Sequence, residues 1–585
     1  MEENLLVAKQ ATRVECPPQT TEDAEIFDVI VIGSGAGGMV AALVCRAAGL
    51  DVVVLEKTEY FGGSTAVSGG AMWLPGNQHA QALGLSDDRE AVLTYLRTLV
   101  GHRLQPDLID AYLDNAPQMV MFMEQTTSMR FVARKYSPDY HPDIAGAALG
   151  GRTLDPAPFD ARLLGRHFAT LRPPFQSFMA FHGMMVNRTD IEHLLTAFRS
   201  FKSFRHALAL LAQYGAARLT HPRGTRLLMG NALAARLLKS AIDAGVTLRL
   251  HSAAEEIILK NQLVHAVRVH ASGKSRLMTA RQAVIMATGG FPHDPSRVAQ
   301  LVPTAKTHYT MAPAGNSGDG IQMVLKIGGI LSDDNKNPVF FAPVSIMKNP
   351  DGTETRFPHL IMDRQKPGLV AVNKAGRRFV NEANSYHDFV EAMCDPQADY
   401  PAIPAFLICD HVFLKHYGLG LVRPGPRRLH PFIDAGYLVK AETIAELAIK
   451  LDLPVTALGQ TIARMNDAAK TGHDPEFGKG STDYNRYLGD PRHHPNPCLG
   501  PIQHAPFYAV RVYPGDIGTA TGLRVDTQAR VLRPDGTLIT GLYAVGNDMN
   551  SVMAGTYPAA GITLGPAMTF GYIAGRSIVQ QTRSV

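Results

Sequence analysis

A glycine-rich turn near the start of the chain has the residue types and spacing of a dinucleotide site. The apolar run Val29–Ile32 leads into Gly33-x-Gly35-x-x-Gly38, and after an alanine-rich segment a second apolar run ends in Glu56. In such a strand, turn, helix and strand, the glycines allow a tight turn and a close approach of pyrophosphate to the backbone and to the helix N-terminus. An acidic residue about 20 positions further on binds a ribose hydroxyl. The pattern therefore predicts dinucleotide binding, with Glu56 on the ribose.

Later segments favour FAD over NAD as the dinucleotide. A second run of backbone N–H groups and hydroxyls, Gly62–Thr65, follows Glu56 and could extend along a longer cofactor. Two strand-like segments, "AVIMATGGF" and "GLYAVGND", end in further glycines. The predicted cofactor-binding residues are Gly33, Gly35, Ala36, Gly37, Gly38, Glu56, Lys57, Gly62, Gly63, Ser64, Thr65, Gly69, Gly70, Thr288, Gly289, Gly546, Asn547 and Ile562.

From Phe27 to about Arg576, these segments together resemble the FAD-binding superfamily of fumarate reductases and 3-ketosteroid dehydrogenases. The resemblance implies an α/β fold in which a discontinuous Rossmann-like FAD-binding domain carries an inserted α+β catalytic domain. The expected parts are a flexible arm at 1–24, FAD-binding segments at 25–318 and 519–585, and a catalytic domain at 319–518. Because no histidine lies between Gly62 and Gly70, we expect FAD to be bound non-covalently. No second glycine motif of this kind is present, so an NAD(P)H site is not expected and the electron acceptor stays unknown.

Within that superfamily, the chain departs from fumarate reductases where those enzymes hold a dicarboxylate. After the shared Arg378-Phe-Val-Asn-Glu382 element come Tyr386 and His387 in place of a proton-donating arginine, and Tyr557 stands where an arginine would clamp a carboxylate. The chain is instead similar to the 3-ketosteroid Δ1-dehydrogenases. This similarity implies that Tyr557 and Gly561 bind the C3 carbonyl, that Tyr386 is the base and that Tyr140, in "YSPDYHPD", assists it.

The expected reaction requires hydrogen-bond donors to the carbonyl oxygen and a base. Two hydrogen bonds to the C3 carbonyl would acidify the C2 proton, which a base removes while flavin N5 accepts hydride from C1. A phenol has an ordinary pKa of about 10 and is a poor base alone, so a second hydroxyl is needed beside Tyr386. Each tyrosine taken singly is typical of packing. Their joint placement predicts catalytic roles for Tyr557, Gly561, Tyr386 and Tyr140.

Other functions remain open at this level. A 3-ketosteroid Δ4-(5α)-dehydrogenase is one alternative, although Tyr140 favours the 1,2 reaction, and a fumarate or enoate reductase is another. A non-enzymatic alternative is a membrane-docked, flavin-binding interaction module. The net charge of +5 is too small to indicate nucleic-acid binding, and five scattered cysteines without a CxxC pair predict neither a structural metal nor disulfides. We expect a cytoplasmic protein.

The segment from about 163 to 221 is predicted to be a helical insertion. Leu194, Phe198, Phe201, Leu208 and Leu211 fall on one helical stripe, with basic residues such as Arg199 and Lys202 elsewhere. A basic, aromatic, amphipathic helix can lie in a membrane interface. Packing on the protein's own core or on a second subunit is the commoner explanation. The sequence leaves both open, and docking would place the protein at the inner face of the membrane.

Overall fold

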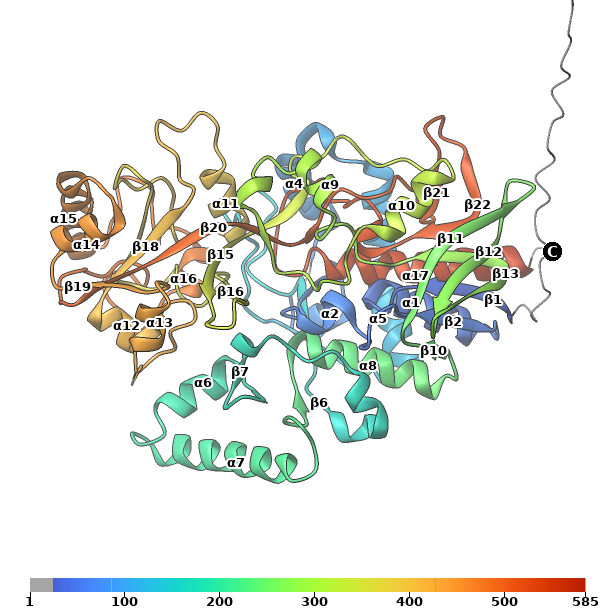
Figure 1. Cartoon of the computed structure of the whole chain (residues 1–585), viewed down its shortest axis with the longest axis horizontal. Helices are drawn as coiled ribbons and strands as arrows, with labels where there is room; N and C mark the ends of the chain where they lie inside the picture. Colours follow the sequence, from blue (N-terminus) through green and yellow to red (C-terminus); the bar gives the residue numbers. More distant parts are fainter. Residues whose placement is uncertain (1–24, 86, 427, 584–585) are drawn as a thin grey trace, which may run out of the picture.

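The computed structural model describes residues 25–583 except 86 and 427, so the arm expected at 1–24 lies outside the described residues. Two sheets divide the chain (Figure 1). One is built from the N-terminal half and the C-terminal end, and the other from residues 309–519 between them. The predicted α/β class, with a discontinuous nucleotide-binding domain and an inserted mixed domain, is confirmed.

The first sheet has eight strands, and its parallel centre is β10-β2-β1-β13. The β22 strand also runs parallel to β13, although the whole second sheet lies between them in the sequence. Antiparallel β11, β12 and β21 extend the sheet. The strand bounds are β1 Glu25–Ile32, β2 Val52–Leu55, β10 Thr247–Arg249, β11 Ser252–Lys260, β12 Leu263–Ala271, β13 Lys274–Met286, β21 Arg530–Leu532 and β22 Leu538–Ala544.

The second sheet has seven strands and is mostly antiparallel, in the order β16-β15-β20-β18-β17, with β14 and β19 also on β20. Its first strand, β14, begins at Tyr309, ahead of the boundary expected at 318/319. Flanking helices include α11 Tyr386–Met393, α14 Ile444–Leu451, α15 Val455–Thr471 and α16 Asp483–Leu488. The strand bounds are β14 Tyr309–Thr310, β15 Val339–Lys348, β16 Glu354–Pro358, β17 Leu369–Val372, β18 Ala405–Asp410, β19 Val439–Ala441 and β20 Phe507–Thr519.

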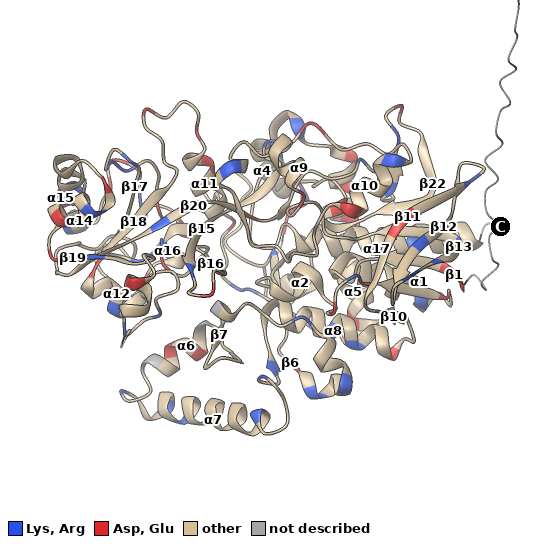
Figure 2. Cartoon of the chain, in the orientation of Figure 1, with Lys and Arg blue, Asp and Glu red and all other residues tan. Residues whose placement is uncertain are grey.

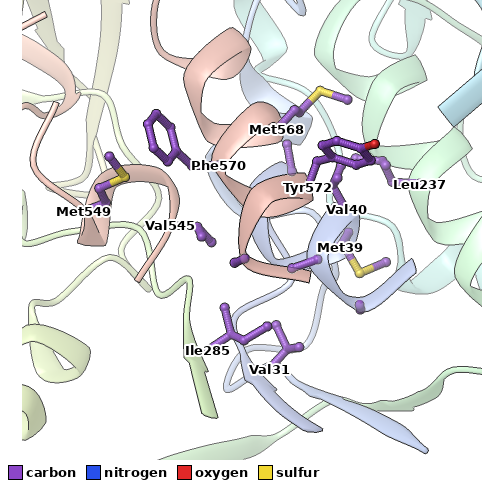
Figure 3. Close-up of a cluster of buried hydrophobic side chains, with 14 of the residues drawn as sticks. Val31, Met39, Val40, Leu237, Ile285, Val545, Met549, Met568, Phe570 and Tyr572 are labelled. Atoms are coloured by element: carbon purple, nitrogen blue, oxygen red, sulfur yellow. The ribbon is translucent and has the colours of Figure 1, made fainter. Parts of the chain in front are cut away.

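The two ends of the described chain meet in the core of the first domain. Helix α1 (Ala36–Ala47) follows the glycine turn and packs along α17 (Leu564–Arg583). Figure 3 shows Met39 and Val40 of α1 on the side of α17 where Tyr572 lies, above Val31 and Ile285 of the sheet. No larger residue fits at Gly571, since a Cβ there would lie 2.3 Å from the Gly37 carbonyl oxygen. Helices α5 (Pro106–Thr126) and α8 (Met229–Asp243) cover the same core.

The insertion differs from the long helical stripe that the sequence predicted. It contains the short 3-10 segments 161–170 and 176–178, a small β7–β8 hairpin (Met179–Ala180 and Met184–Met185), and two helices, α6 (Arg188–Leu195) and α7 (Phe201–Arg218). The chain leaves the helix at Thr196, whose hydroxyl donates to the Glu192 carbonyl oxygen (2.7 Å) and is also hydrogen-bonded to the Ser203 hydroxyl of α7 (3.0 Å). Leu194 and Phe198 therefore do not continue the face of α7, and the single-stripe prediction is wrong.

Candidate active site

A cavity of about 1790 Å³ runs from the carboxyl ends of β1 and β2 to the junction of the two domains and on beneath the insertion. Of the predicted cofactor residues, Gly62 and Ile562 do not line it. Gly62 lies behind it and donates its N–H to the Ser34 hydroxyl (2.9 Å), and Ile562 faces a small adjoining hollow. Those that line the cavity are Gly33, Gly35, Ala36, Gly37, Gly38, Glu56, Lys57, Gly63, Ser64, Thr65, Gly69, Gly70, Thr288, Gly289, Gly546 and Asn547.

The glycine turn has the shape of a phosphate cradle. Gly33 has φ +109°, and a Cβ there would lie 2.1 Å from the Ala287 carbonyl oxygen, so only glycine fits. Gly35 and Gly63 instead leave open space where side chains would project, with their backbones facing each other across it. The Thr65 hydroxyl accepts the Ala36 N–H at the start of α1 (3.0 Å). These groups fit the pyrophosphate of a dinucleotide at a helix N-terminus.

The carboxylate of Glu56 is held where it can meet a ribose. One oxygen accepts from the Ser34 hydroxyl (2.6 Å), and the other accepts from the N–H and the hydroxyl of Thr58 (3.0 and 2.9 Å). Glu56 is 8% exposed and lines the cavity, and a carboxylate has further lone pairs for sugar hydroxyls. The neighbouring Lys57 ammonium is bound by Asp319 (2.7 Å).

A buried carboxylate joins the two distant glycine segments that complete the nucleotide site. Asp548 accepts the Gly290 N–H (2.9 Å) and the Thr288 hydroxyl (2.9 Å), which links the loop after β13 to the loop after β22. Burial raises the pKa of Asp548, and these donors oppose the shift. The cross-link keeps Gly289 and Gly546 on one side of the cavity.

The structure brings the three predicted catalytic tyrosines together although they come from three distant segments. The hydroxyls of Tyr140 and Tyr386 are 3.3 Å apart. The Tyr557 ring is stacked on Tyr140 at 5.5 Å between centroids and meets Tyr386 edge-on at 5.1 Å. All three are under 10% exposed and line the cavity, as does Gly561. The predicted constellation is thus a contiguous cluster.

The backbone next to this cluster is fixed by a shared acceptor. The Pro558 carbonyl accepts the Tyr140 N–H (2.8 Å) and the hydroxyl of Tyr95 (2.7 Å), a buried residue of α4 (Arg89–Val100). Gly561 has φ +97°, and a Cβ there would lie 2.6 Å from the backbone nitrogens of Met72 and Trp73. Position 561 therefore presents bare backbone to the cavity, close to the Tyr557 ring.

Burial controls the acidity of these phenols. It raises the pKa of Tyr140 to about 12 and raises the pKa of Tyr386 and of Tyr557 further above the ordinary value, because a phenolate loses its hydration in the cluster. The hydrogen bond with Tyr386 opposes the shift at Tyr140. The charges and hydrogen bonds of Tyr140 and Tyr557 raise the pKa of Tyr386 in the same direction as burial.

Several neighbours of the cluster were not predicted from the sequence. Tyr484 of α16 packs on Tyr140 with 4.6 Å between ring centroids, and the buried ring of His387 lies 5.5 Å from Tyr557. His387 was noted in the sequence without a role. Its Nδ1 accepts the Phe341 N–H (3.1 Å), which fixes the ring against Tyr557. The motif around Tyr484, "STDYNRYLGD", carries no spacing that could have identified it.

The chain is similar to known proteins in sequence and in fold. The family model described as "FAD binding domain" matches residues 28–564. The chain is 38% identical to a 4-oxocyclohex-2-ene-1-carboxylate 5-dehydrogenase of Sinomonas cyclohexanicum (94% of each chain covered) and 38% identical to a 3-oxosteroid 1-dehydrogenase of Mycobacterium tuberculosis (95% and 98%). A crystal structure of 3-ketosteroid delta1-dehydrogenase from Sterolibacterium denitrificans, in complex with 1,4-androstadiene-3,17-dione, superposes with a TM-score of 0.88 at 35% identity (95% and 100%).

Proposed function

We propose that this chain, which belongs to the FAD binding domain family, is a 3-oxosteroid 1-dehydrogenase. It is an FAD-dependent dehydrogenase of 3-oxo compounds. The observation that carries the proposal is the cluster of Tyr140, Tyr386 and Tyr557 beside Gly561 at one end of the cavity. The predicted nucleotide-binding residues that line the cavity would hold FAD, and the predicted non-covalent attachment of FAD is part of the proposal.

Each group in the cluster has a role in the proposed reaction. The Tyr557 hydroxyl and the Gly561 N–H donate to the C3 carbonyl oxygen, which acidifies the C2 proton. Tyr386 takes that proton, and the Tyr140 hydroxyl donates to the Tyr386 oxygen at 3.3 Å. When bound, FAD supplies the acceptor for the hydride that leaves C1. Because the tyrosines are buried, water is kept from the reacting carbons.

The size and lining of the cavity support a steroid over a small ring with a carboxylate. Typical ligand pockets are about 300–1,000 Å³, so about 1790 Å³ accommodates FAD and a second large ligand. Beyond the cluster the lining includes Phe175, Phe178 and Met179. The Arg134 guanidinium near Tyr140 is already bound by Asp155 through two hydrogen bonds of 2.8 Å. This arrangement favours an apolar body with one polarised oxygen.

Anaerobic mixing with substrates tests the proposed function. We expect 4-androstene-3,17-dione to bleach the flavin absorbance and to give the 1,4-diene product. A 4-oxocyclohexanecarboxylate should bleach it more slowly, since its small ring would leave much of the cavity unfilled. Rapid bleaching by the carboxylate, with none by the steroid, would move the substrate to the small-ring class. Reoxidation of reduced enzyme by fumarate, without bleaching by either ketone, would favour the fumarate-reductase alternative.

The surface of the insertion supports membrane docking over the core-packing alternative. Phe198, Phe201 and Leu208 are 97%, 81% and 56% exposed. Figure 2 shows Lys and Arg along α7, which projects from the body of the molecule. Among the described residues, none of the helices combines the length and the apolar composition needed to cross a bilayer. We propose that α7 lies on an anionic membrane surface at its cytoplasmic face, next to the end of the cavity that Phe178 and Phe181 line.

Removing charge from this surface is expected to release the protein from vesicles. A lysine or arginine near an anionic surface contributes about 1 kcal/mol, so Arg199→Gln with Lys202→Gln should weaken binding to phosphatidylserine vesicles about 25-fold. Sedimentation with vesicles measures the change. Lys450→Gln with Lys470→Gln, on α14 and α15, is the matched control, because Figure 1 shows these helices at the upper left while α7 lies along the lower edge. Equal binding of both double variants would contradict docking through α7 and favour a second subunit on this face.

A further inference from the structure

One side chain joins the wall of the cavity that the second domain provides to the wall that the insertion provides. Arg423 lies in the loop after α12 (His411–Tyr417). Its guanidinium donates to the backbone carbonyl oxygens of Met179 (2.6 Å) and Gln176 (3.4 Å), both in the insertion. All three residues line the cavity. We call this contact the Arg423 bridge, and it connects segments that are 244 positions apart in the sequence.

The Arg423 bridge lies at the open end of the cavity, away from the tyrosine cluster. The three tyrosines of the cluster are each under 10% exposed. Arg423 is exposed, and Phe181, which also lines the cavity, is 55% exposed. The cavity runs from the nucleotide cradle past the cluster and on beneath the insertion. A steroid whose C3 carbonyl is held at the cluster therefore points its C17 substituent towards this open end.

A buried polar network lies behind the loop that carries Arg423. The His359 ring is hydrogen-bonded to the Asp363 carboxylate through Nδ1 (2.6 Å) and to the Ser345 hydroxyl through Nε2 (2.7 Å). The Ser345 hydroxyl is in turn 2.7 Å from the hydroxyl of Tyr437. All four side chains are buried. A polar network that is satisfied inside the protein is rigid, so it can hold a neighbouring loop in one conformation.

The network holds the loop through two backbone N–H groups. Asp363 accepts the Gly420 N–H (3.2 Å), and the Tyr437 hydroxyl accepts the Leu421 N–H (2.9 Å). Gly420 has φ +58°, and a Cβ there would lie 2.1 Å from the Tyr437 hydroxyl, so only glycine fits. Arg423 follows two positions after Leu421. Because the backbone is fixed so close to it, the bridge can open only if the guanidinium leaves the two carbonyls.

We propose that Arg423 is a specificity-determining residue, which limits the length of the C17 substituent that the substrate can carry. The proposal rests on the proposed function, because it takes the steroid to be held at the tyrosine cluster. A 3-oxosteroid with only a ketone at C17 is oxidised with the bridge closed. A long hydrocarbon side chain has to displace the guanidinium from the two carbonyls. This cost in free energy is absent for the shorter substrate, so the bridge discriminates between the two.

Removal of the guanidinium tests the proposal. The measurement is the ratio of kcat/KM for 4-cholesten-3-one to kcat/KM for 4-androstene-3,17-dione. Both steroids are supplied with cyclodextrin and without vesicles, so that membrane docking does not contribute. Hydrogen bonds from a charged donor are worth about tenfold or more in an equilibrium, and we expect the ratio to rise about tenfold in Arg423→Ala. Arg423→Lys should give a smaller rise, since an ammonium can still donate to one carbonyl but lacks the planar fork of the guanidinium.

Arg428→Ala is the matched control, because Arg428 is exposed in the same loop and does not line the cavity. It should keep the wild-type ratio. A ratio in Arg423→Ala within twofold of wild type, even with both substrates slowed, would overturn the proposal and leave Arg423 only a role in holding the walls together. An equal rise in Arg428→Ala would also overturn it. Wild-type protein that oxidises neither steroid would instead overturn the proposed function, and the specificity proposal with it.

Discussion

Tyr386→Phe is expected to bind FAD and steroid normally and to lose proton abstraction, with bleaching of the flavin slowed by about 10³-fold. The phenylalanine ring keeps the edge-on contact with Tyr557 at 5.1 Å, so the packing of the cluster is preserved. Only the oxygen that receives the C2 proton is removed. Stopped-flow absorbance under anaerobic conditions gives the rate, and equilibrium titration with the 1,4-diene product gives binding.

The pH profile identifies the missing group. Because burial raises the pKa of Tyr386 well above its ordinary value, its phenolate fraction is small at neutral pH and grows about tenfold per pH unit. The wild-type bleaching rate should therefore rise with pH up to at least pH 10 without a plateau. In Tyr386→Phe the residual rate should be independent of pH. A wild-type profile that is flat from pH 7 to 10, or undiminished turnover in the variant, would remove Tyr386 from the role of base.

Tyr557→Phe is expected to lower kcat by about 100-fold, or ~3 kcal/mol of activation free energy, because one donor to a developing oxyanion is lost. The ring stack on Tyr140 at 5.5 Å and the contact with Phe340 remain available to phenylalanine. Steady-state kinetics with 4-androstene-3,17-dione measures the change.

The effects of Tyr557→Phe on kcat and on KM distinguish two roles for the hydroxyl of Tyr557. A donor that strengthens only as charge develops lowers kcat and kcat/KM together, whereas a donor used equally by bound substrate raises KM alone. We expect the first pattern. A rise in KM with unchanged kcat would show that Tyr557 holds the carbonyl without polarising it. The absorbance spectrum of bound FAD should be the same in variant and wild type, since Glu56 and the glycine turn are unaltered.

The nucleotide-binding half of the site could be predicted from the sequence because the residues that form its glycine turn and ribose contact are close together in the chain. Gly33, Gly35 and Glu56 lie within one strand, turn, helix and strand, whose hydrogen bonds and φ angles restrict the residue types. The second apolar run, which was predicted to be a strand ahead of Glu56, forms β2 (Val52–Leu55) in the structure. Gly62 and Ile562 were also predicted to bind the cofactor, and in the structure neither lines the main cavity.

The substrate-binding half of the site could be predicted only from the resemblance to a known family. Tyr140 and Tyr386 are 246 positions apart in the sequence, and no local pattern indicates that their hydroxyls come into contact. The positions of Tyr95 and Tyr484 beside the cluster could not be predicted from the sequence. Tyr95 binds the Pro558 carbonyl oxygen and Tyr484 packs on Tyr140, and both contacts exist only after folding. In the insertion, hydrophobic spacing suggested one helix. The hydrogen bonds of the Thr196 hydroxyl with Glu192 and Ser203 stabilise a break between α6 and α7. The spacing of hydrophobic residues gives no indication of such a break.

The packing of α1 against α17 determines when, during synthesis of the chain, the first domain can fold completely. While the ribosome is still synthesising the middle of the chain, the α1 face that carries Met39 and Val40 has no α17 to cover it. The Gly546 loop and β22, which complete the nucleotide cradle, are also made near the end of translation. The complete FAD site can therefore form only after the C-terminal end of the chain has been synthesised.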